Sequence, residues 1–135
     1  MVALGSRATL DSVREATAVA AKAAWSKGGA DTVVLAVGGV LAITDAFVIT
    51  SGSNPRMVRT IADEVEKQVK LACSWSPRAV EGLDDSRWVL MDYGDFVVHV
   101  FMDEARDFYQ FDRLWADSHR WDWQSGDPDT IASGE

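Results

Sequence analysis

The most informative stretch of the sequence is WVLMDYGDFVVHVF, residues 88–101. Two apolar runs flank residues 92–95, and glycine accepts the positive φ that a tight turn requires. The stretch therefore predicts a β-hairpin with Tyr93-Gly94 as its two-residue turn. In that register Asp92 would face Asp95 across the hairpin, and Trp88 would face His99.

Side chains alternate between the two faces of a strand, so the predicted hairpin has two unlike faces. One face is entirely apolar and is expected to lie in the core; it carries Val89, Met91, Phe96, Val98, Val100 and Met102. The other mixes aromatic, aliphatic, acidic and titratable side chains: Trp88, Leu90, Asp92, Asp95, Val97, His99 and Phe101. This mixture favours a docking surface for a partner. The alternative is that a helix covers this face too, and that the two aspartates only flank the turn.

Three helices are expected around this hairpin. An Ala-rich segment at 9–27 favours a helix that Thr9 or Asp11 caps. A second helix should begin after Asn54, because the apolar residues that follow fall on one stripe: Val58, Ile61, Ala62, Val65 and Val69. A third should run from residue 103 to about residue 115. Its expected apolar stripe is Phe108, Phe111, Leu114 and Trp115.

Runs of β-branched residues at 31–37 and 46–50 predict strands, and Pro77 favours a short edge strand at 75–80. The order of elements predicts an α/β fold with a mixed β-sheet of about five strands and three helices. Trp121 and Trp123 would pack either on this domain or on a partner. The expected organisation is a flexible lead at 1–8, a single α/β domain at 9–117 and an acidic tail at 118–135.

The net charge of −8 is unevenly distributed along the chain. Residues 1–80 hold 9 basic and 7 acidic groups, whereas residues 81–135 hold 4 basic and 14 acidic groups. The second half should repel phosphate and attract a basic partner, so direct binding to DNA or RNA is not expected. The alternative is that the acidity only aids solubility.

The sequence also favours a cytoplasmic protein. The apolar runs are shorter than the roughly 20 residues that a membrane helix needs, and the first 25 residues lack the pattern of a signal peptide. The lone Cys73 fits a reducing compartment and is expected to be a small buried side chain.

The residues that could carry chemistry do not form a complete set. His99, His119 and Cys73 lack the spacing of a metal site, so no metal and no cofactor is expected. Gly52-Ser53 before a helix could bind a phosphate. Nucleotidyltransferases combine such a turn with an Asp-x-Asp pair that holds Mg²⁺, and no such pair follows Ser53. The chain is therefore expected not to be an enzyme, the alternative being a nucleotidyltransferase-like enzyme with an altered metal site.

Four segments in the same order resemble the ribosomal silencing factors, the Iojap-like family. The strongest is the hairpin stretch itself. The others are TDAFVI at 44–49 followed by Ser-Gly-Ser at 51–53, Val-Glu-Gly at 80–82, and the segment from Arg-Asp-Phe-Tyr at 106–109 through Leu-Trp at 114–115. The resemblance covers roughly residues 31–117. Ala46, Phe111 and Ala116 depart from the family's usual residues, in ways that suggest only altered packing.

The resemblance implies a nucleotidyltransferase-like fold without a complete active site. It also implies binding to the fourteenth protein of the large ribosomal subunit, a basic protein at the face where the subunits meet. Occupying that face would block subunit joining and repress translation, notably when nutrients are short. The free protein would be a homodimer. The residues expected to bind the partner are Trp88, Leu90, Asp92, Tyr93, Gly94, Asp95, Val97, His99 and Phe101.

Overall fold

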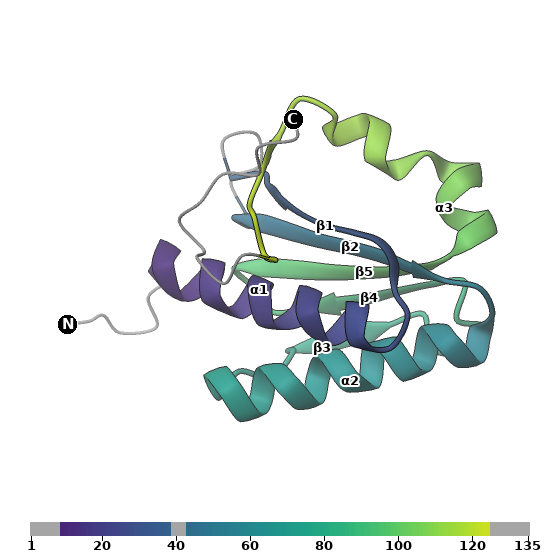
Figure 1. Cartoon of the computed structure of the whole chain (residues 1–135), viewed down its shortest axis with the longest axis horizontal. Coiled ribbons are helices and arrows are strands. Elements are labelled where there is room, and N and C mark those ends of the chain that lie inside the picture. Colours follow the sequence, from purple (N-terminus) through teal and green to yellow (C-terminus); the bar gives the residue numbers. More distant parts are fainter. Residues whose placement is uncertain (1–8, 39–42, 125–135) are drawn as a thin grey trace.

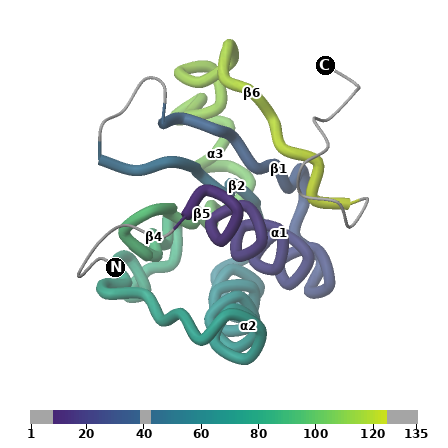
Figure 2. The backbone as a smooth tube through the Cα atoms, turned by 90° about the vertical axis from the view of Figure 1, so that its left-hand side faces the viewer, coloured from purple at the N-terminus to yellow at the C-terminus, as the bar shows by residue number. Residues whose placement is uncertain are grey.

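The computed structural model describes residues 9–38 and 43–124. One mixed sheet lies between two helices on its first face and a shorter helical segment on its second face (Figures 1 and 2). The helices are α1 (Leu10–Ser26), α2 (Pro55–Cys73), α3 (Asp103–Tyr109) and the 3₁₀ turn η1 (Phe111–Trp115). The strands are β1 (Ala30–Ala36), β2 (Ala46–Gly52), β3 (Ala79–Glu81), β4 (Trp88–Asp92), β5 (Phe96–Met102) and β6 (His119–Arg120).

The sheet has the order β3-β4-β5-β2-β1-β6, in which β2 and β5 are parallel and the other neighbours are antiparallel. The prediction of a mixed α/β fold with three helices is confirmed. The described residues form six strands rather than about five. An edge strand is present near the expected 75–80, but it spans only 79–81, and Pro77 precedes it. The likeness to nucleotidyltransferases stays a prediction.

The first face of the sheet is covered by α1 and α2, and both helices begin at the expected caps. The Thr9 hydroxyl accepts a hydrogen bond from the Ser12 amide at 3.1 Å, and the Asn54 side chain accepts one from the Met57 amide at 2.8 Å. The predicted stripe of α2 is buried from Val58 to Val69. Because the buried face of α1 is mostly alanine, its axis can approach the sheet and α2 closely.

The hairpin of β4 and β5 has the predicted faces but a different register. The apolar face is confirmed, since every member from Val89 to Val100 is fully buried and Met102 is half-buried. Trp88 pairs with Phe101 and Asp92 with Val97, so the predicted pairs Trp88–His99 and Asp92–Asp95 are wrong. The turn is centred on Gly94 and Asp95 instead. A shift of two residues leaves every side chain on its original face, which explains why the faces survive the error.

The third helix is shorter than predicted. It ends at Tyr109 because Gln110 adopts a left-handed conformation with φ +51°, and η1 then continues in a new direction. Phe111 and Trp115 pack on the second face as expected. Phe108 and Leu114 are 74% and 71% exposed, so the predicted single stripe is wrong for these two residues.

The sheet continues past residue 117, where the sequence analysis ended the domain. His119 and Arg120 pair with Ala36 and Leu35 of β1, beside which β6 runs in Figure 2. Trp121 and Trp123 are then buried in the core cluster that includes α1. The two tryptophans therefore pack on the domain itself. The predicted lead at 1–8 and the end of the predicted tail at 125–135 lie outside the described residues.

Candidate docking site on the second face of the sheet

The second face of the sheet is covered at one end and accessible at the other. Under α3 and η1 lies an apolar cluster built from Leu35, Val37, Phe47, Ile49, Phe101 and Ala105. His99 is only 4% exposed and Phe101 is fully buried, so a helical segment does cover this part of the face, as the alternative interpretation proposed. The half-buried residues at the edge of this cover and beyond it are Trp88, Leu90, Asp92, Asp95 and Val97, and we call them the docking strip.

Tyr93 lies on the opposite side of the hairpin, inside the core. It is 4% exposed and stacks on Phe96, with ring centroids 4.5 Å apart and planes within 7° of parallel. Burial, with a smaller contribution from the charge of Glu66, raises the pKa of its hydroxyl. The structure therefore gives Tyr93 a packing role. Gly94, also expected to bind the partner, is half-buried in the turn, where φ is +86°.

Asp92 is engaged within the chain. One carboxylate oxygen accepts a hydrogen bond from the Gly94 amide at 2.8 Å, and the other lies 3.2 Å from Nε of Arg78. The Arg78 side chain is largely exposed, so this ion pair contributes little to stability. Asp92 nevertheless fixes the turn, and it has a nearby cation that the spacing in the sequence did not indicate. The backbone oxygen of Asp95 accepts from the Asp45 amide at 2.8 Å, which ties the turn to the start of β2.

Trp88 stands at the boundary between the docking strip and the covered cluster. Its indole Nε1–H donates to Nδ1 of His99 over 3.1 Å. The ring also packs against Phe101, Tyr109 and Phe111, with centroids 4.7, 5.4 and 5.5 Å away. Tyr109 is half exposed beside Trp88, and it extends the docking strip onto α3. Tyr109 was not among the predicted binding residues, because spacing along the chain does not show where a helix after the hairpin will lie.

His99 is a neutral imidazole enclosed by aromatic rings. Its ring lies 4.7 Å from those of both Phe47 and Phe111, and burial lowers its pKa to about 3. Since Nδ1 accepts the indole proton, the imidazole proton must be on Nε2. Nε2 is buried and has no hydrogen-bond partner among the described residues. His99 thus lies behind the docking strip and not on it.

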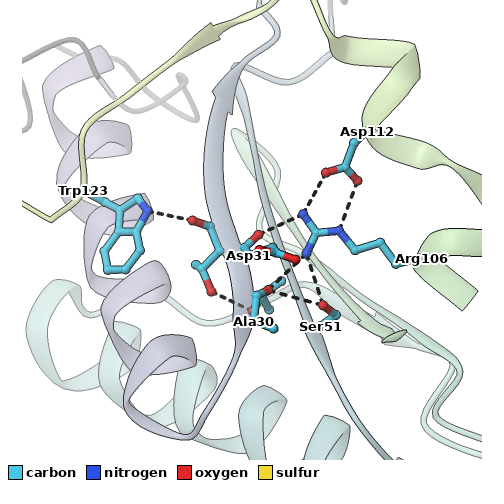
Figure 3. Close-up of polar contacts among 8 residues, drawn as sticks. Ala30, Asp31, Ser51, Arg106, Asp112 and Trp123 are labelled. Carbon is cyan, nitrogen blue, oxygen red and sulfur yellow. Dashed lines mark hydrogen bonds and ion pairs between the residues drawn. The ribbon is translucent and has the colours of Figure 1, made fainter. Parts of the chain in front are cut away.

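Arg106 holds the covering segment in place (Figure 3). Its guanidinium donates to the backbone oxygens of Ala30 and Asp31 at 3.1 and 2.9 Å, and to the Ser51 hydroxyl at 3.2 Å. It also pairs with both carboxylate oxygens of Asp112, at 3.2 and 2.8 Å. The backbone at Ala30 and Asp31 is available because the register of β1 is irregular there and Asp31 has φ +49°. One largely buried side chain therefore joins α3, η1, β1 and β2.

The described residues also bear on the metal and phosphate sites that the sequence raised. They contain no group of three or more His, Cys, Asp or Glu side chains arranged to hold a metal ion. At the turn into α2, the amide and hydroxyl of Ser53 lie 3.3 and 3.4 Å from the sulfur of Met57. No helix in the described ranges is both long enough and apolar enough to cross a membrane.

Comparisons with known proteins show which family the chain belongs to. A family model described as "Ribosomal silencing factor during starvation" matches residues 10–134. The chain is 36% identical over 100 residues to the ribosomal silencing factor RsfS of Bacillus subtilis, a match that covers 74% of this chain and 84% of that protein.

Two crystal structures share the fold. One, from Bacillus halodurans, is 34% identical with a TM-score of 0.66 and covers 76% of this chain and 94% of that one. The other, from Chromobacterium violaceum, is 29% identical with a TM-score of 0.73 and covers 77% and 86%. The chain therefore belongs to the ribosomal silencing factor family, a family of ribosome-associated regulators of translation.

Proposed function

We propose that this protein binds the large ribosomal subunit through its fourteenth ribosomal protein and blocks joining of the small subunit. Translation would then fall, notably when nutrients are limiting. The observation that carries the proposal is the docking strip, in which Trp88, Leu90 and Val97 form a half-buried band at the edge of the part of the sheet that α3 and η1 cover. Partly accessible aromatic and aliphatic side chains of this kind are typical of the energetic centre of a protein interface.

The charge around the strip supports a basic partner. Acidic side chains are frequent on the elements that carry the strip and its cover, namely the end of β3, the β3–β4 connection, the hairpin turn and α3; the exposed ones include Glu81, Asp84, Asp85, Asp103, Glu104 and Asp107. Complementary charge speeds encounter and favours the correct orientation, while the apolar centre supplies the binding free energy. Steric exclusion by a bound domain requires no chemistry from this chain, in agreement with a regulatory role.

Two further properties belong to the same proposal. We propose that the free protein forms a homodimer, for which the exposed Phe108 and Leu114 of the covering segment offer apolar surface. Sedimentation equilibrium of the wild-type chain and a Phe108→Ser/Leu114→Ser variant tests this. We also propose that the protein acts in the cytoplasm, where ribosomal subunits meet.

Co-sedimentation with purified large subunits tests the main proposal, and light scattering during subunit mixing tests the block. Leu90→Ala should weaken capture by about 1–2 kcal/mol, because it removes apolar contact at the centre of the strip. Leu71→Ala is the matched control, since Leu71 is exposed on α2 at the other face of the sheet. The proposal fails if wild-type protein neither sediments with large subunits nor slows their joining.

A further inference from the structure

Trp88 has an orientation that a buried side chain enforces. The indole donates to Nδ1 of His99, a diagonal neighbour on the adjacent strand, since the direct partner of Trp88 is Phe101. The nitrogen edge of the indole is therefore turned towards the sheet, while part of the ring remains accessible beside Tyr109. A different rotamer of Trp88 would leave its indole N–H without this acceptor.

The imidazole of His99 makes only part of its possible hydrogen bonds in the folded chain. Its Nε2–H is buried among Phe47 and Phe111 and has no partner among the described residues, so folding leaves a polar hydrogen without an acceptor. An apolar side chain at this position would avoid that cost. An apolar side chain could not accept the hydrogen bond from Trp88, which is the one hydrogen bond that the imidazole makes with the described residues.

We infer that His99 is a positioning residue of the docking strip: it holds the Trp88 ring in the orientation that the partner meets, without contacting the partner itself. The inference rests on the proposed function and changes the role expected for His99 from a contact to a support. A ring fixed before binding loses less conformational freedom on binding, which strengthens association without any added contact.

Aromatic packing is the competing explanation, because Phe101, Tyr109 and Phe111 also surround Trp88. Two neutral substitutions separate the explanations. His99→Asn places Oδ1 the same number of bonds from Cα as Nδ1, so it retains an acceptor for the indole. His99→Leu fills a similar space without an acceptor. If packing alone holds the ring, the two variants should behave alike.

The first readout does not require the ribosome. In ¹⁵N-labelled protein the indole N–H signal of Trp88, identified by its loss in Trp88→Phe, should keep its position and slow solvent exchange in His99→Asn. In His99→Leu it should move and exchange faster. An unchanged indole signal in His99→Leu would overturn the inference, because the ring would then be held by its aromatic neighbours.

The second readout is capture of large subunits. His99→Leu should weaken capture about tenfold, the effect of one buried hydrogen bond, while His99→Asn should stay within about twofold of wild type. In a Trp88→Phe background, which has no indole donor, His99→Leu should cause no further loss. A further loss there would assign His99 a role independent of Trp88 and overturn the inference. If wild-type protein is not captured at all, the proposed function fails and the docking role of His99 fails with it, while the indole signal still reports whether His99 holds the ring.

Discussion

At the scale of single residues, the burial of His99 has a consequence for acid stability. The imidazole has a pKa of about 3 in the folded chain and an ordinary value of 6.5, so it takes up a proton on unfolding at any pH between these values. The unfolding free energy should therefore fall as the pH drops below about 6.5 and should continue to fall towards pH 3. Between pH 7 and pH 4.5 the loss due to His99 is on the order of 2–3 kcal/mol.

Urea unfolding at several pH values measures this loss. His99→Asn removes the titrating group, so its unfolding free energy should fall less steeply with acid than that of wild type. His119→Asn is the matched control, because His119 is exposed in β6, and it should follow the wild-type curve. Parallel curves for wild type and His99→Asn would show that His99 is not buried as a neutral imidazole.

The alternation along β5 gives a second prediction at this scale. Val98 is fully buried on the first face, whereas its neighbour Val97 is half-buried on the second face. Val98→Asp should place an unpaired charge in the core and destabilise the domain by several kcal/mol. Val97→Asp should remain folded and should lower the melting temperature much less than Val98→Asp does, because Val97 is only half-buried. If Val98→Asp melts like the parent, the assignment of the two faces is wrong.

At the scale of elements, the covering segment of α3 and η1 depends on Arg106. The segment buries few side chains of its own, with Ala105 the one buried residue of α3 and no residue of η1 fully buried. Arg106→Leu should therefore loosen it, since the backbone oxygens of Ala30 and Asp31 and the Asp112 carboxylate would lose their donor. Amide hydrogen exchange across 103–118 should become faster, with a loss of about 2–4 kcal/mol in unfolding free energy.

Arg113→Leu is the control for this substitution. Arg113 carries the same charge on η1, but it is exposed, and its guanidinium donates to the side-chain oxygen of Gln110 at 2.7 Å. It should change amide exchange only slightly. Equal exchange in the two variants would mean that Arg106 does not hold the segment on the sheet.

The elements also show what the sequence could and could not predict. The faces of the hairpin and the stripe of α2 follow from local periodicity, and caps such as Asn54 from local chemistry. The register of the hairpin does not follow from periodicity, because a shift of two residues leaves the alternation of faces intact. The break at Gln110 was missed because no glycine or proline marks it. Likewise, Arg106 reaches backbone about 75 residues earlier in the chain, and such a contact leaves no local signal.

At the scale of the whole molecule, charge divides roughly between the two faces of the sheet. The half of the chain that supplies α1 and α2 is nearly balanced, whereas residues 81–124, which supply the hairpin and the covering segment, hold 11 acidic and 4 basic groups. This arrangement would direct the second face towards a basic protein and away from RNA phosphates. Capture of large subunits should therefore weaken as salt rises, because salt screens exposed charges over about 8–10 Å at physiological ionic strength.

Reversal of one charge on each face tests this arrangement. Asp95→Lys raises the net charge by two units within the docking strip. Asp63→Lys makes the same change on the exposed side of α2. At low salt, Asp95→Lys should reduce the association rate with immobilised large subunits by about tenfold, because electrostatic steering acts chiefly on encounter. The difference should shrink at 0.5 M salt, while Asp63→Lys should bind at close to the wild-type rate throughout. Equal rates for the two variants at low salt would exclude the second face as the side that approaches the ribosome, since both variants change the net charge by the same amount.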